Sequence, residues 1–95
     1  LDPSNFEPHN AAGCACGRLG DAKLALRHFE EAHRLSPSNI RVETNLGITL
    51  YRLGRDEEAD RHLSSVLEKD PLCADAVTAL AGISSRRLRG SGTLR

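Results

Sequence analysis

Aromatic residues are scarce in this chain of 95 residues, which has two phenylalanines, one tyrosine and no tryptophan. Proteins that bind single-stranded nucleic acid stack the bases on aromatic side chains, so this scarcity argues against that class. The formal net charge is zero, with 13 basic and 13 acidic residues. A neutral chain lacks the positive field that attracts nucleic acids and anionic membranes. The sequence therefore predicts neither a nucleic acid nor a membrane as a partner.

Long hydrophobic runs are also missing. No segment approaches the ~18 consecutive apolar residues that a membrane-spanning helix requires. The first five residues, Leu-Asp-Pro-Ser-Asn, lack the basic and apolar regions of a secretory signal. The chain has three cysteines, an odd number that argues against a disulfide framework. A reducing compartment, and hence the cytoplasm, is the expected location.

A repeat of 34 residues organises the chain. Residues 13–37 and 47–71 match when one segment is shifted onto the other. The matched pairs are Gly13 and Gly47, Arg18 and Arg52, Leu19 and Leu53, Gly20 and Gly54, Ala25 and Ala59, Arg27 and Arg61, His28 and His62, and Pro37 and Pro71. Phe29 is replaced by Leu63, so this position stays apolar. Repeats of this length are supersecondary units that stack, because one unit cannot bury its apolar face alone.

Apolar residues at spacings of three and four predict five helices. We expect them at residues 6–19, at 22–35, at 40–53, from a cap at Asp56 to about Lys69, and at 74–88. Residues 1–5 match the end of a preceding repeat, and residues 89–95 read as a flexible tail. Arg86, Arg87 and Arg89 form a basic cluster, which we interpret as a solvated helix end in preference to an anion site. The predicted inward faces are Ala22, Ala25, Leu26, Phe29, Ala32 and Leu35; Val42, Leu46, Leu50 and Leu53; Ala59, Leu63, Val66 and Leu67; and Val77, Leu80 and Ile83.

The repeat resembles the tetratricopeptide repeat family. The small residue of helix A, the first helix of each repeat, falls on Gly13 and Gly47. Gly13 and Gly17 also interrupt the first expected helix, where a glycine suggests that a neighbouring helix approaches closely. The resemblance places the first repeat at residues 6–39, the second at 40–73, and a third A-type or capping helix at 74–88. It implies an all-α fold of antiparallel helix–turn–helix repeats, stacked as a right-handed α-solenoid of about two and a half repeats. One departure is that the family's tryptophan position in helix A carries His9 and Glu43.

The resemblance also implies a non-enzymatic scaffold that binds a partner peptide or helix in a concave groove lined by the A helices. The candidate partner-binding residues are Asn10, Cys14, Arg18, Arg41, Asn45, Ile48, Tyr51 and Arg52. An asparagine can bond a peptide backbone, an arginine can grip a carboxylate, and a tyrosine offers rigid contact area. Each of these residues could instead simply be solvated on its helix. The uncovered end helices suggest self-association of the chain as well.

Catalytic and metal-binding patterns are not evident in the sequence. No serine or cysteine is accompanied by a recognisable base and orienting acid, so we expect no enzymatic activity and no cofactor. Cys14 and Cys16 are two residues apart on a helix and point to different faces, while His28 and His62 are expected to be exposed; we therefore predict no metal site. Two alternatives remain open at this stage. The array could be the regulatory or substrate-docking part of a larger enzyme such as a glycosyltransferase, or a related helical repeat that binds RNA.

Overall fold

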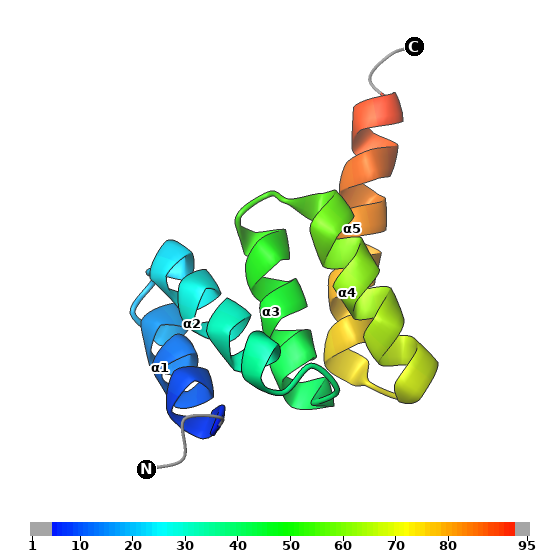
Figure 1. Cartoon of the computed structure of the whole chain (residues 1–95). Coiled ribbons are helices and arrows are strands. Elements are labelled where there is room, and N and C mark those ends of the chain that lie inside the picture. The colour runs from blue at the N-terminus through cyan, green and yellow to red at the C-terminus, as the bar shows by residue number, and fades with distance from the viewer. Residues whose placement is uncertain (1–4, 93–95) are drawn as a thin grey trace.

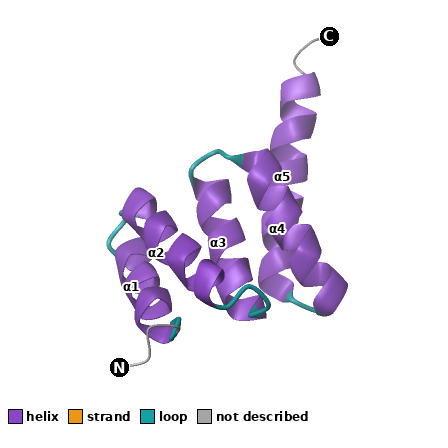
Figure 2. Ribbon diagram, viewed as in Figure 1, coloured by secondary structure: helices purple, strands orange, loops and turns teal. Residues whose placement is uncertain are grey.

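The computed structural model describes the backbone of residues 5–92 and the side chains of residues 5–88. These residues form five α-helices: α1 (Glu7–Arg18), α2 (Ala22–Leu35), α3 (Ile40–Arg52), α4 (Asp56–Lys69) and α5 (Ala74–Gly92). Figure 2 shows helices and loops but no strand in this part of the chain. The predicted all-α fold is confirmed.

Consecutive helices form two hairpins that stack in a row (Figure 1). Helix α1 packs on α2 and α3 packs on α4, while α2 and α3 contact each other across the junction of the two hairpins. Helix α5 packs against both α3 and α4. The hairpins turn at Gly20 and Gly54, which have φ angles of +86° and +81°. This left-handed backbone favours glycine, which has no Cβ to clash with it.

Side chains cap two of the helices. The carboxylate of Asp21 accepts a hydrogen bond from the backbone N–H of Leu24 at 3.1 Å, and Asn39 caps α3 in the same way. The predicted cap of α4 is wrong. Asp56 is the first residue inside that helix, and Arg55 occupies the cap position without a capping hydrogen bond. The carboxylate of Asp56 instead binds the guanidinium of Arg86 from α5.

Helix α5 is longer than the sequence suggested. It continues to Gly92, beyond the expected end at Leu88. Glycine weakens a helix but keeps its backbone N–H, so it does not force an end as proline does. Residues 89–92 of the predicted tail are therefore helical, and residues 93–95 lie outside the described residues. Of the segment 1–5, only Asn5 is described; its side chain accepts a hydrogen bond from the backbone N–H of Glu7.

The core follows most of the predicted faces. Its buried apolar residues are Ala25, Leu26, Phe29, Ala32, Val42, Leu46, Leu50, Ala59, Leu63, Val66, Ala76, Ala79 and Ile83. Ala22, Leu35, Leu53, Leu67 and Leu80 are half-buried. The prediction for Val77 is wrong, since its side chain is 48% exposed. Ala76 and Ala79 face α3 and α4 in its place, because the apolar spacing of this helix is shifted relative to the other repeats.

Glycine brings the two helices of each hairpin close together. A Cβ on Gly13 would lie 2.6 Å from the Phe29 ring, and one on Gly47 would lie 2.7 Å from the Leu63 side chain. Real Cβ atoms are not found at such distances from other heavy atoms, so the large side chain of α2 or α4 fills the space that the glycine leaves. The close approach predicted at Gly13 is confirmed, and Gly47 repeats it in the second hairpin. At Gly17 it is not found, since a Cβ there would meet only Nη1 of Arg52 at 3.6 Å.

Candidate functional site

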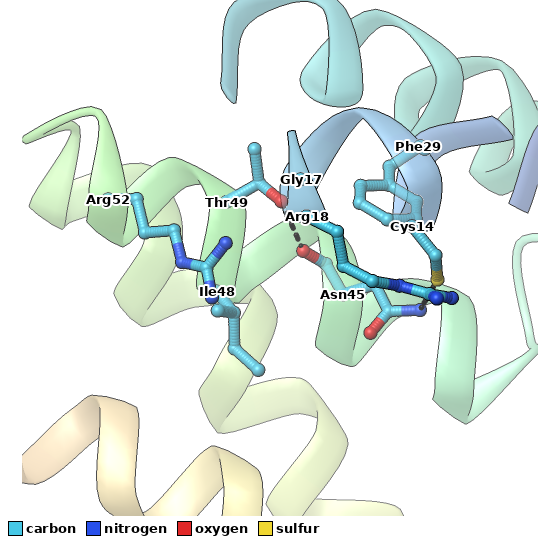
Figure 3. Close-up of a pocket in the computed structure, with 9 residues that line it drawn as sticks. Cys14, Gly17, Arg18, Phe29, Asn45, Ile48, Thr49 and Arg52 are labelled. Carbon is cyan, nitrogen blue, oxygen red and sulfur yellow. Dashed lines mark hydrogen bonds between the residues drawn. The ribbon is translucent and has the colours of Figure 1, made fainter. Parts of the chain in front are cut away.

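A hollow of about 320 Å³ lies between α1 and α3 (Figure 3). Its lining combines small, apolar, polar and cationic residues: Gly13, Cys14, Gly17 and Arg18 from α1, Phe29 from α2, and Asn45, Ile48, Thr49 and Arg52 from α3. The structure thus brings together five of the eight candidate partner-binding residues. Gly17 contributes by having no side chain, which leaves open space at the surface of α1.

Hydrogen bonds fix the polar side of this hollow. The Nδ2 atom of Asn45 donates to Oδ1 of Asn10 at 3.1 Å and contacts Sγ of Cys14 at 3.9 Å. Asn10, a sixth candidate, is therefore joined to the hollow through Asn45. The Oγ1 atom of Thr49 donates to the backbone oxygen of Asn45 at 2.8 Å. With its nitrogen engaged, Asn45 presents its side-chain oxygen as an acceptor.

Two arginines at equivalent positions of the repeat stand at the edge of the hollow. Arg18 and Arg52 are exposed and lie in the last turns of α1 and α3, where positive charge suits the helix dipole. Nη1 of Arg52 lies 3.6 Å from the place that a Cβ on Gly17 would take, so this side chain reaches toward α1. Neither arginine belongs to an ion pair among the described residues. The hollow therefore has two uncompensated positive charges beside it.

Arg41 lies at the other end of α3. It lines an adjoining hollow of about 270 Å³, together with Ile40, Thr44, Asn45, Asp70, Cys73 and Asp75. Its guanidinium Nη2 is 3.5 Å from a carboxylate oxygen of Glu7. Asn45 lines both hollows, so the two form one surface along α3. The charge at this end is mixed, in contrast to the positive end at Arg18 and Arg52.

Tyr51 has a different environment from the other candidates. Its ring lies under the guanidinium of Arg86, whose carbon is 4.3 Å from the ring centre. A Cβ on Gly82 would lie 2.7 Å from Cζ of the same ring. Tyr51 is thus a packing residue between α3 and α5, and the basic cluster that we expected to be solvated contributes Arg86 to this contact. The sequence did not predict this pairing, nor did it predict Thr49 in the lining of the hollow.

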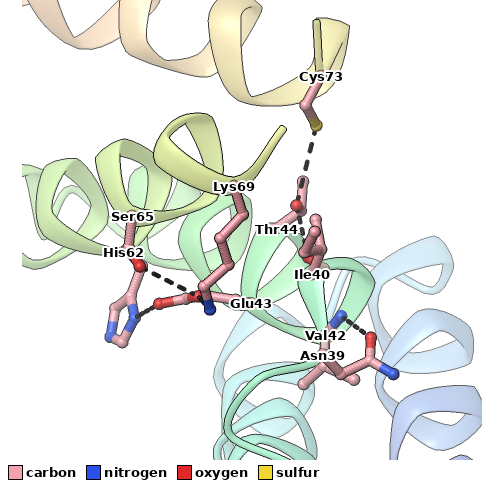
Figure 4. A network of polar contacts seen from close by, with 9 residues as sticks. All are labelled: Asn39, Ile40, Val42, Glu43, Thr44, His62, Ser65, Lys69 and Cys73. Carbon is pink, nitrogen blue, oxygen red and sulfur yellow. Dashed lines mark hydrogen bonds and ion pairs between the residues drawn. The ribbon is translucent and has the colours of Figure 1, made fainter. Parts of the chain in front are cut away.

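A second polar cluster surrounds Glu43 at the junction of α2, α3 and α4 (Figure 4). Glu43 is only 5% exposed. Its carboxylate lies 3.1 Å from Nδ1 of His62, 3.5 Å from Oγ of Ser65 and 3.6 Å from Nζ of Lys69. The expectation that His28 and His62 are exposed is wrong. His28 is half-buried, and the side chain of His62 is partly buried and bonded to Glu43. A signal for this cluster was present, because Glu43 occupies the position where the resembled family places a tryptophan.

His33 completes this cluster from α2. Its ring lies edge-on to that of His62, with the ring centres 5.3 Å apart. Burial lowers the pKa of His33; the charge of Glu43 opposes that shift, and the charges of His62 and Lys69 add to it. The Nδ1 atom of His33 is buried and has no hydrogen-bond partner among the described residues.

Comparison with known proteins identifies the family. The model of the tetratricopeptide repeat matches residues 18–83, from the last turn of α1 into α5. No curated protein sequence matches the chain. Tetratricopeptide repeats generally mediate protein–protein interactions and are typically non-enzymatic modules. No helix in the described part combines the length and the apolar character needed to cross a membrane. With more than half of its length matched and its helices stacked as repeated hairpins, this chain belongs to the tetratricopeptide repeat family.

Proposed function

We propose that the hollow between α1 and α3 binds an acidic peptide segment of another protein, and that the chain serves as a non-enzymatic scaffold for it. The observation that supports this most directly is the pair Arg18 and Arg52, which stand beside the hollow without an acidic partner among the described residues. A carboxylate of the partner would satisfy either guanidinium with two parallel hydrogen bonds.

The lining of the hollow suits a peptide in two further ways. The side-chain oxygen of Asn45 can accept a hydrogen bond from a backbone N–H of the partner, because Asn10 and Cys14 already engage its nitrogen. Ile48, which is half-buried, offers apolar surface for a side chain. The volume of about 320 Å³ is at the lower end of the ~300–1,000 Å³ range of small-molecule pockets. A hollow of this size accommodates individual side chains of a segment that continues along α3.

Charge reversal tests the proposal with a matched control. The test variant is Arg18→Glu with Arg52→Glu; the control is Arg27→Glu with Arg61→Glu, an equal charge change at exposed sites on α2 and α4. A random peptide library selected against the unmodified chain supplies the probes, and fluorescence anisotropy measures their binding. We expect acidic peptides, and a loss of affinity of about tenfold or more in the test variant, the cost of one lost charge-assisted bond.

The control variant should keep its affinity within about twofold, since charges far from the site are screened by salt. Circular dichroism verifies that both variants remain folded. Selection of peptides without acidic residues, or an equal loss of affinity in both variants, would contradict the proposal.

A further inference from the structure

The cluster around Glu43 has the composition of a transition-metal site. His33 from α2, Glu43 from α3 and His62 from α4 each offer one ligand atom, and these atoms all lie within 4.8 Å of one another. Imidazole nitrogen and carboxylate oxygen are the ligands that zinc and its neighbours prefer when no thiolate is present. We propose that these three side chains bind one divalent transition-metal ion of the zinc type.

The geometry is close to that of an occupied site. Metal–ligand bonds of ~2.0–2.2 Å in a tetrahedron hold neighbouring ligand atoms roughly 3.4 Å apart. Nδ1 of His62 and Oε2 of Glu43 are already 3.1 Å apart. The widest separation in the cluster has to close by up to about 1.4 Å, which side-chain rotation of the part-buried His33 and His62 would supply. Three protein ligands leave the fourth position to water.

The surroundings of Glu43 and His33 also favour the binding of a metal ion. A buried carboxylate requires compensating charge, and Glu43 receives it at 3.6 Å from Lys69, whose side chain is 41% exposed. A dication compensates this carboxylate more strongly and lets the lysine return to water. Nδ1 of His33 is buried without a hydrogen-bond partner among the described residues, which is unusual for a polar atom. A ring orientation that turns this nitrogen onto the ion gives it the partner that it lacks.

Binding would fasten the two repeats together. The three ligands come from three helices, with His33 in the first hairpin and Glu43 and His62 in the second. An ion that binds only the folded state stabilises it in proportion to the logarithm of its concentration. At a concentration about 100 times the dissociation constant, we expect the melting temperature of this small domain to rise by about 10–20 °C.

The experiment measures binding of Zn²⁺ and Co²⁺ to the chelator-treated chain. Calorimetry should show one saturable equivalent of zinc, and the melting temperature should rise with it. The absorption of bound Co²⁺ should lack a thiolate charge-transfer band, which separates this site from Cys14, Cys16 and Cys73, all free thiols. The site variant His33→Ala with His62→Ala should no longer bind this one equivalent of zinc.

The chain offers a matched control in a second histidine pair. His9 and His28 lie with their ring centres 5.8 Å apart in the first hairpin, and no carboxylate completes a metal cluster with them among the described residues. His9→Ala with His28→Ala should retain zinc binding. Glu43→Gln keeps the side-chain shape and should lower the affinity at least about tenfold, which tests the site even where the double alanine variant does not fold. Absence of a saturable equivalent, a thiolate band, or loss of binding in the control would overturn the proposal.

Discussion

Arg86 of α5 contacts Tyr51 of α3 in two ways. Its guanidinium lies 4.3 Å from the centre of the ring, and its Nη2 atom donates a hydrogen bond to the backbone oxygen of Tyr51 at 2.8 Å. The same guanidinium binds the carboxylate of Asp56 at the start of α4. One side chain therefore joins the last helix to both helices of the second hairpin.

We predict that Arg86→Ala weakens the docking of α5 and lowers the melting temperature. The substitution removes a cation–π contact, a bond to a helix-terminal carbonyl and a charged pair at once. Arg87→Ala is the control. Among the described residues, the one polar contact of Arg87 is the exposed ion pair with Asp60 at 3.0 Å, and such pairs contribute little. Thermal unfolding followed by circular dichroism measures both. Equal melting temperatures for the two variants would contradict the prediction.

Alanine in place of glycine should have opposite effects at two positions. Gly47→Ala places a Cβ 2.7 Å from Leu63, and we expect a net destabilisation of about 1–2 kcal/mol after the gain in helix propensity is counted. Gly17→Ala meets only Nη1 of Arg52 at 3.6 Å, an ordinary contact, and should stabilise the chain by about 0.5–1 kcal/mol. Urea unfolding gives both free energies. Stabilisation by both substitutions would show that the close contact at Gly47 relaxes without cost, and destabilisation by both would contradict the prediction for Gly17.

Phe29 should be indispensable to the first hairpin. It is buried against Gly13 and the rest of the core. Phe29→Ala leaves a cavity and should cost about 3–5 kcal/mol, a large part of the stability of a small domain. Leu35→Ala, at a half-buried position of the same helix, should cost less. A melting curve of Phe29→Ala that matches that of the unmodified chain would mean that this core face is assigned wrongly.

Self-association of the chain remains a prediction, and the exposed apolar side chains of α5 allow it to be tested. Helix α5 leaves Val77 and Leu88 exposed, at 48% and 71%. We expect light scattering at high micromolar concentration to give a mass near twice that of one chain, because burying such side chains is favourable. Val77→Glu with Leu88→Glu should restore the monomer, whereas Leu72→Glu, in the turn before α5, should not. A monomeric mass for the unmodified chain would refute this prediction.

The repeat spacing predicted the parts of the fold that recur. Gly20 and Gly54 turn the chain with positive φ, and Phe29 and Leu63 occupy equivalent buried positions. These features depend on local backbone geometry and on the apolar period, both of which are visible in one sequence. The register of α5 is shifted, so the sequence did not reveal that Tyr51 meets Arg86.

The candidate site was predictable in part for the same reason. Helical spacing brought Arg18, Asn45 and Arg52 to one surface, because equivalent positions of successive A helices face the same side. The burial of Glu43 was not anticipated, since a carboxylate is normally solvated unless its partners are known. Those partners come from three helices, and their meeting depends on how the hairpins stack.

The glycine contacts and the Glu43 cluster have different places in the stack. Gly13 with Phe29 and Gly47 with Leu63 lock the helices within each hairpin, whereas Glu43 joins groups from both sides of the joint between the hairpins. Each hairpin should therefore move as a stiff body, and bending should concentrate where α2 meets α3. The group bound to the Glu43 carboxylate, a side chain or a metal ion, would then influence the angle between the two hairpins. That angle in turn would change the width of the hollow between α1 and α3 in which we propose that a peptide binds.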